Sequence, residues 1–217
     1  MEEQRDEKIM WIVAVLPVVV ASMMLQVIPD MIPHKIGIFI FPIVILCVTF
    51  FWHLLIGKTV KASTDKERME ANSSARVLCV VGLSQAIMFG IMNYCILYSS
   101  CVQENVNGSK VTVDIARISC ILCGIIFVVA GNYMTKAKRN TVVGFRTAWS
   151  MYNDNTWRKS NRFGAISIVV AGVLTIITAA FANGITSTIL LLVYLLSATI
   201  SAILYSKKVY DQEKREV

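Results

Sequence analysis

The feature that most constrains the fold is a series of six apolar stretches, each about as long as a lipid bilayer is thick. A hydrocarbon core of about 30 Å needs roughly 20 residues of α-helix, because each residue advances the helix by about 1.5 Å. The stretches lack the alternation of barrel strands, and helices satisfy their own backbone hydrogen bonds in lipid. We predict an all-α polytopic membrane protein, a bundle of six transmembrane helices at residues 9–28, 36–57, 77–98, 115–134, 164–182 and 185–206.

The basic residues lie almost entirely on one side of the predicted membrane. The chain of 217 residues is 56% hydrophobic with a net charge of +7. That composition disfavours a soluble nucleic-acid-binding protein, a secreted disulfide scaffold and a disordered tail. Of the 21 Lys and Arg residues, 18 fall in the two tails and in the connections 58–76 and 135–163. The positive-inside rule therefore predicts that both termini are cytoplasmic. We expect membrane lipids as partners and no direct contact with nucleic acid.

Charged side chains are nearly absent from the predicted spans. Five of the six contain no Asp, Glu, Lys or Arg, and Arg117 lies close enough to one end of the fourth span to snorkel to the interface. This pattern disfavours an ion-coupled transporter. Uncharged polar residues in the spans are expected to hydrogen-bond neighbouring helices, and neither histidine has a carboxylate on its face. The alternative function is a small transporter or lipid-binding permease that uses Gln85, Asn93 and Asn132 as a midplane site.

No motif in the sequence predicts catalysis, a metal or a cofactor. Cys120 and Cys123 have CxxC spacing, but their apolar span holds no second Cys or His pair to complete four ligands. We interpret them as small hydrophobic residues. The chain has no nucleophile elbow, P-loop, zinc-protease motif or dinucleotide-binding motif. The prediction is a non-enzymatic protein without a cofactor.

Two local expectations concern how the spans are connected and packed. The charged segment from Thr64 to Glu70 is predicted to form a short solvated helix that links spans two and three. Small residues at four-residue spacing predict close packing of the last two spans. These residues are Ala171, Thr175, Ala179, Ala198 and Ala202.

The longest predicted connection runs from Lys136 to Phe163 and mixes basic with aromatic residues. Seven Lys and Arg residues alternate with Trp149, Trp157 and other rings, as is typical of a segment in the headgroup layer. Asn153-Asp154-Asn155 argues against one continuous helix, because Asn and Asp favour caps and turns. We therefore predict a broken pair of short helices. The segment is either a lipid-anchoring elbow or a site for a partner, and the sequence leaves both open.

Residues in and around this connection resemble the SdpI family of bacterial immunity proteins. The pattern is Gly131-Asn132-x-Met134, then Asn140, Gly144-x-Arg146-Thr147-x-Trp149, Trp157 and Asn161-Arg162-x-Gly164. The six-span layout extends the resemblance, and residues 28–34 are similar to a segment that often precedes the pattern, here shortened. The resemblance implies two regions: an N-terminal hairpin and linker at 1–76, and a four-span region at 77–217 with a signature loop at 131–164.

The resemblance implies protection of a bacterium from its own membrane-active peptide toxin. In some members it also implies sequestration of a transcriptional repressor at the membrane. A multi-pass protein of the bacterial cytoplasmic membrane is therefore predicted, with a peptide toxin and a cytoplasmic repressor as candidate partners. The candidate residues for binding a toxin, a partner or a lipid headgroup are Asn132, Asn140, Gly144, Arg146, Thr147, Trp149, Trp157, Asn161 and Arg162. The guanidinium groups of Arg146 and Arg162 would bind carboxylates or phosphates, and the Trp side chains would fix the depth of the segment in the membrane.

Overall fold

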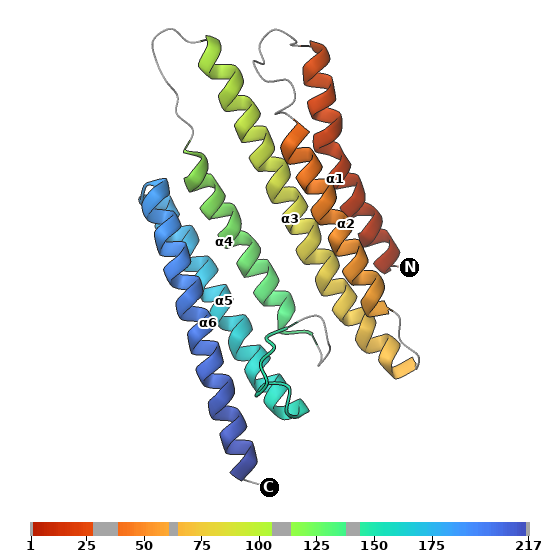
Figure 1. Cartoon of the computed structure of the whole chain (residues 1–217), viewed down its shortest axis with the longest axis vertical. Helices are drawn as coiled ribbons and strands as arrows, with labels where there is room; N and C mark the ends of the chain where they lie inside the picture. The colour runs from red at the N-terminus through yellow and green to blue at the C-terminus, as the bar shows by residue number, and fades with distance from the viewer. Residues whose placement is uncertain (1, 28–38, 61–64, 106–113, 138–143, 216–217) are drawn as a thin grey trace.

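Six long α-helices make up nearly all of the structure. The computed structural model describes residues 2–27, 39–60, 65–105, 114–137 and 144–215. Figure 1 shows α1, α2 and α3 side by side in one group and α4, α5 and α6 in another, with α3 and α4 in contact between the groups. The helices are α1 (Glu2–Val27), α2 (Ile40–Val60), α3 (Asp65–Asn105), α4 (Ile115–Met134), α5 (Asp154–Phe181) and α6 (Gly184–Arg215).

Four helices in the described part of the chain are long and apolar enough to cross a membrane. They are the segment Ala75–Tyr98 of α3, together with α4, α5 and α6. The apolar segment of α2, Pro42–Gly57, is shorter. The all-α class is confirmed, and an apolar helical segment occupies each of these five predicted positions. The N-terminal 28–34 segment that resembles the SdpI family lies outside the described residues.

The connection between α2 and α3 differs from the prediction. Residues 65–76 are not a separate linking helix, because they form the first turns of α3, which continues for 41 residues, or about 60 Å. This segment contains neither Gly nor Pro and is rich in Glu, Lys, Arg and Ala, all good helix formers. Nothing in it stops the helix before the apolar part begins. Thr64, the predicted cap, lies outside the described residues.

Polar contacts join the first three helices within their apolar surroundings. Trp52 Nε1 of α2 donates to Gln85 Oε1 of α3 at 2.9 Å, which confirms that Gln85 hydrogen-bonds a neighbouring helix. His53, for which no carboxylate was expected on its own helix face, has one from a neighbouring helix, because its Nδ1 contacts the Glu7 carboxylate of α1. The sequence pattern missed this pair because the two residues lie 46 positions apart on different helices.

Small residues allow α4 and α5 to approach closely. A Cβ added to Gly124 would lie 2.8 Å from the Gly172 carbonyl oxygen, and one added to Gly172 would lie 2.6 Å from that of Gly124. Two turns further along α4, a Cβ added to Gly131 would lie 2.7 Å from the carbonyl oxygen of Ala165. The five small residues predicted for close packing in α5 and α6 are all buried. Close contact between the two backbones thus packs α4 directly against α5.

A single Asp–Arg pair fastens three helix ends together. Asp114 accepts from the backbone N–H of Arg117 at 3.0 Å and from that of Gly184 at 2.9 Å, so it caps both α4 and α6. Arg117 lies in the first turn of α4, at this end of its predicted span. Its guanidinium donates to the carbonyls of Ala179, at 2.6 Å, and Ala180, at the C-terminal end of α5. Each charge therefore sits at a helix end of opposite partial charge.

Candidate functional site

The segment between α4 and α5 is shorter than the sequence predicted. Residues 144–153 form turns, and α5 begins at Asp154 instead of near Gly164. The break predicted around Asn153 is confirmed, because Asn153 caps α5 in a reciprocal capping box with Thr156. The predicted pair of short helices is wrong. No helix breaker follows the cap until Gly164, so Trp157 and Asn161 belong to the first turns of a long helix.

Gly144 opens this turn segment in a conformation that excludes other residues. Its φ is +116°, the only positive value recorded for a glycine in the described chain. A Cβ there would lie 2.5 Å from the ring of Trp157 and 2.8 Å from Asn161 Oδ1. Three of the predicted site residues therefore meet at one point. Trp157 is 3% exposed and Asn161 is 2% exposed, so this meeting point lies inside the protein.

Asn161 ties the turn segment to the end of α4. Its Oδ1 accepts from the backbone N–H of Phe145 at 2.9 Å, and its Nδ2 donates to the carbonyl of Met134 at 2.8 Å. The amide thus satisfies the Phe145 N–H, which lies outside regular secondary structure, and adds a second hydrogen bond to the Met134 carbonyl, which also accepts from the Ala137 N–H at 3.1 Å. Phe145 also packs over Gly164, where an added Cβ would lie 2.9 Å from the ring.

Thr147 and Ser150 fold the turn segment and attach it to α6. The backbone N–H of Thr147 donates to Ser150 Oγ at 2.8 Å, and that of Ser150 donates to Thr147 Oγ1 at 3.0 Å. Thr147 Oγ1 also lies 2.8 Å from Ser206 Oγ of α6. Ser150 and Ser206 are fully buried. Neither serine could be recognised from the sequence, because a lone serine has no distinctive spacing.

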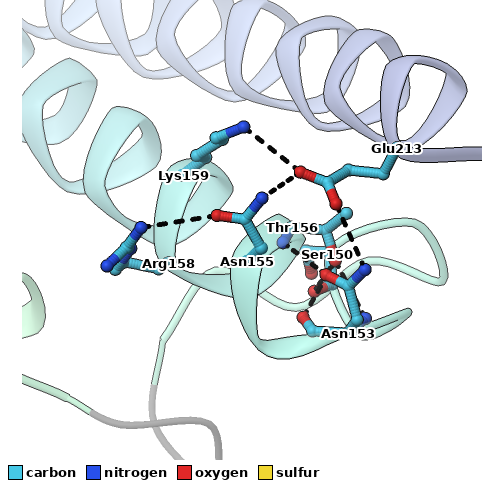
Figure 2. Close-up of polar contacts among 7 residues, drawn as sticks. All are labelled: Ser150, Asn153, Asn155, Thr156, Arg158, Lys159 and Glu213. Carbon is cyan, nitrogen blue, oxygen red and sulfur yellow. Dashed lines mark hydrogen bonds and ion pairs between the residues drawn. The ribbon is translucent and has the colours of Figure 1, made fainter. Parts of the chain in front are cut away.

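Glu213, in the part of α6 beyond its predicted span, gathers three side chains from the start of α5 (Figure 2). It accepts from Asn153 Nδ2 at 3.4 Å, from Asn155 Nδ2, and from Lys159 Nζ at 3.2 Å. The hydrogen bond from Lys159 is the main cause that holds the pKa of the Glu213 carboxyl below its ordinary value, assisted by the two amides. No sequence pattern distinguishes Glu213 from the other charges of the C-terminal tail.

The aromatic residues mostly bind the helices to one another. Phe163 stacks on Tyr205 with ring centroids 4.1 Å apart, and Tyr152 meets Tyr210 edge to face at 5.0 Å. The predicted placement of the rings in the headgroup layer is therefore wrong for Trp157, which is buried in the protein because α5 begins early and turns this residue inward. Trp149 is half-buried, with Lys207 Nζ 5.9 Å from its ring centroid.

Seven of the nine predicted site residues divide into two sets, and the half-buried Trp149 belongs to neither. Gly144, Thr147, Trp157 and Asn161 hold the turn segment in place from inside, as described above. Asn132, Arg146 and Arg162 are exposed. Asn140 lies outside the described residues. In the part of the chain that is described, the inner set is a network of hydrogen bonds and packed rings, so any contact with another molecule falls to the exposed set.

This segment is similar in sequence to known proteins. Residues 136–206, from the end of α4 to the buried Ser206 of α6, match the SdpI/YfhL protein family. The resemblance to the SdpI family is confirmed. The chain is also 25% identical over 166 residues to Immunity protein SdpI of Bacillus subtilis (strain 168), covering 76% of this chain and 71% of that protein. No solved structure matches. The SdpI-family match contains every predicted site residue except Asn132.

Proposed function

We propose that this chain is a non-enzymatic integral membrane immunity protein that protects a bacterial cell from a membrane-active peptide toxin. The observation that carries the proposal is the similarity to Immunity protein SdpI, which extends over 76% of the chain. Apolar helices of membrane-spanning length support an action within the bilayer, where a membrane-active peptide would be met.

The proposed topology has six spans with both termini in the cytoplasm, in the bacterial cell membrane. The distribution of 18 of 21 basic residues supports this orientation. In this orientation residues 144–153, the start of α5 and Glu213 all lie on the cytoplasmic side. The structure supports a rigid platform there, because part-buried hydrogen bonds join the segment to both α4 and α6.

The exposed residues Arg146 and Arg162 are the proposed contacts of this platform with a partner. Arginine presents a planar fork that binds carboxylate or phosphate groups in two hydrogen bonds. Lipid headgroups and a cytoplasmic repressor both offer such groups. In this proposal the inner residues act by holding the platform in shape, and sequestration of a repressor is a second activity of the same surface.

Survival under toxin challenge tests the proposal. The chain would be expressed in a Bacillus subtilis strain that lacks Immunity protein SdpI and is grown with its toxin-producing parent. We expect the wild type to restore survival and the paired change Arg146→Ala and Arg162→Ala to reduce it. Lys208→Ala is the matched control, since Lys208 is an exposed base of α6 outside the predicted set. Membrane levels would be checked by immunoblot. Failure of the well-expressed wild type to protect would contradict the proposal.

The alternative, a small transporter or permease, gains no support from the arrangement of its proposed residues. Ser119 of α4 contacts Met92 of α3, which places Asn93 at the depth of residue 119. Asn132 lies thirteen residues further along α4, or about 20 Å away along the axis. A groove of about 330 Å³ between α5 and α6 is lined by none of the three amides. Saturable solute flux in proteoliposomes would nevertheless restore this alternative.

A further inference from the structure

Four sulfur-containing or hydroxyl side chains form two adjacent rungs where α3 meets α4. Cys123 Sγ of α4 lies 4.0 Å from Met88 Sδ of α3. One turn away, Ser119 Oγ lies 3.3 Å from Met92 Sδ. Both pairs have four-residue spacing on their helices, so the two sulfurs of α3 lie on the same face, which is the face turned toward α4. Met92 is 8% exposed and Cys123 is half-buried.

The two cysteines of the CxxC sequence point to different neighbours. Cys120 Sγ lies 3.6 Å from Thr188 Oγ1 of α6, whereas Cys123 lies against Met88 of α3. They therefore do not act as the paired ligands of a zinc site. No group of three or more His, Cys, Asp or Glu residues in the described chain is arranged to hold a metal. A site at Cys123 must be completed by methionine thioethers.

We propose that Cys123, Met88 and Met92 bind one Cu(I) ion between α3 and α4. Thiolate and thioether ligands select soft metals such as Cu(I). Metal–sulfur bonds are about 2.3 Å long, so two of them spanning the 4.0 Å between Cys123 and Met88 enclose an angle of about 120°, which suits a trigonal site. In this proposal Met92, one helical turn of about 5.4 Å from Met88 on the same face of α3, supplies the third sulfur by rotating its flexible side chain away from Ser119.

Charge balance favours a monovalent ion in this place. Binding replaces the proton of the Cys123 thiol, which leaves as H⁺, with a Cu–S bond, and both thioethers remain neutral. The product of Cu(I) and one thiolate carries no net charge, whereas Zn(II) with the same ligands would carry +1 in an apolar interior. Met92 must release Ser119 on binding. Ser119 Oγ keeps its other hydrogen bond, to the Ile115 carbonyl at 2.6 Å.

Competition with a chromogenic Cu(I) chelator, under anaerobic conditions and with the purified full chain in detergent, tests the site. We expect the wild type to retain one Cu(I) per chain, and Cys123→Ala and Met88→Leu each to weaken retention at least tenfold. Met92→Leu should weaken it less than Met88→Leu. Cys120→Ala and Cys47→Ala are the matched controls and should bind as the wild type does. X-ray absorption of the loaded protein should show a shell of sulfur atoms only.

Three results would overturn the proposal. The first is a wild-type protein that loses all its Cu(I) at a chelator concentration at which a peptide with one free cysteine still retains the ion. Another is loss of binding in Cys120→Ala equal to that in Cys123→Ala, and the third is full retention by Met88→Leu. Thermal unfolding of every variant identifies any that lose binding through misfolding. If Cys123→Ala or Met88→Leu misfolds, Cys123→Ser or Met88→Ile replaces it. The outcome is independent of toxin survival, so either proposal can fail alone.

Discussion

At the scale of single residues, the turn segment before α5 depends on positions where one atom decides the fit. Gly144 combines a φ of +116° with contact to the Trp157 ring, and Asn161 satisfies backbone groups of two separate segments. Strain and lost hydrogen bonds of this kind cost about 1–3 kcal/mol each. The residues that resemble the SdpI family therefore have a measurable structural role apart from any partner.

Gly144→Ala should lower the thermal unfolding midpoint in detergent. The new Cβ would lie 2.5 Å from the Trp157 ring in a backbone conformation that alanine disfavours, at a cost of about 1–3 kcal/mol or more. Gly57→Ala is the matched control. Gly57 lies in α2 with nothing within 4 Å of an added Cβ, so alanine should leave the midpoint unchanged or raise it. Equal midpoints for the two variants would contradict the strain argument.

Asn161→Ala should destabilise the protein more than Asn132→Ala. It leaves the N–H of Phe145 without its partner, at a cost of about 1–3 kcal/mol, and removes one of two hydrogen bonds to the Met134 carbonyl, which keeps the bond from the Ala137 N–H at 3.1 Å. Asn132 is exposed, so its truncation removes no buried partner of this kind. Hydrogen exchange should accelerate at Phe145 only in Asn161→Ala. Unchanged exchange there would show that the amide does not hold the segment.

At the scale of helices, the close contact of α4 with α5 depends on glycine at the crossing. Gly124→Ala would place a Cβ 2.8 Å from the Gly172 carbonyl oxygen, which is backbone and cannot rotate away. We expect the two helices to separate and the unfolding midpoint to fall by several degrees. Gly90→Ala is the control, since its Cβ would meet only Pro17 Cγ at 3.6 Å, an ordinary contact. A midpoint equal to that of the control would mean that the helices adjust without cost.

The attachment of α6 to α5 through Glu213 should depend on pH. The folded-state pKa of this carboxyl is lowered, chiefly by the hydrogen bond from Lys159. Its contribution is therefore fully present above the unfolded value of about 4.3 and is lost as the pH falls through the folded value. Hydrogen exchange at residues 153–159 should rise in the wild type below that pH. Glu213→Gln should show raised exchange at pH 7 and a weaker acid response; an unaltered response would assign the effect elsewhere.

Helix positions were largely predictable from sequence, and the connections were not. A continuous apolar run reports its own length, so the segments in α2 to α6 could be placed within a few residues. The start of α5 was missed because Asp154 to Phe163 is polar and basic, and this looked like a loop. Contacts of Asn161 with Phe145, and of Asn155 and Lys159 with Glu213, attach one side of these helical turns to the rest of the protein. Such contacts join residues up to 60 positions apart and leave no periodic signal.

At the scale of the whole molecule, an even number of spans should place both ends of the chain on the same side. A fluorescent protein fused to the C-terminus is expected to fluoresce, and alkaline phosphatase in the same place to be inactive, because both report a cytoplasmic position. The phosphatase inserted after Asn183, between α5 and α6, should be active. An active phosphatase at the C-terminus would place this end outside the cytoplasm and would show that the positive-inside assignment of the C-terminal tail is wrong.

The pair Asp114 and Arg117 lowers the electric field that the helix ends produce at this end of the molecule. Two helix N-termini share one carboxylate there, and one helix C-terminus is covered by a guanidinium. The partial charges of these three ends are therefore largely cancelled within a few ångströms, so little electric field extends outward from them. A charged peptide arriving from this side would gain almost no long-range attraction from α4, α5 or α6. Any long-range attraction of such a peptide would have to come from charges outside these three helix ends.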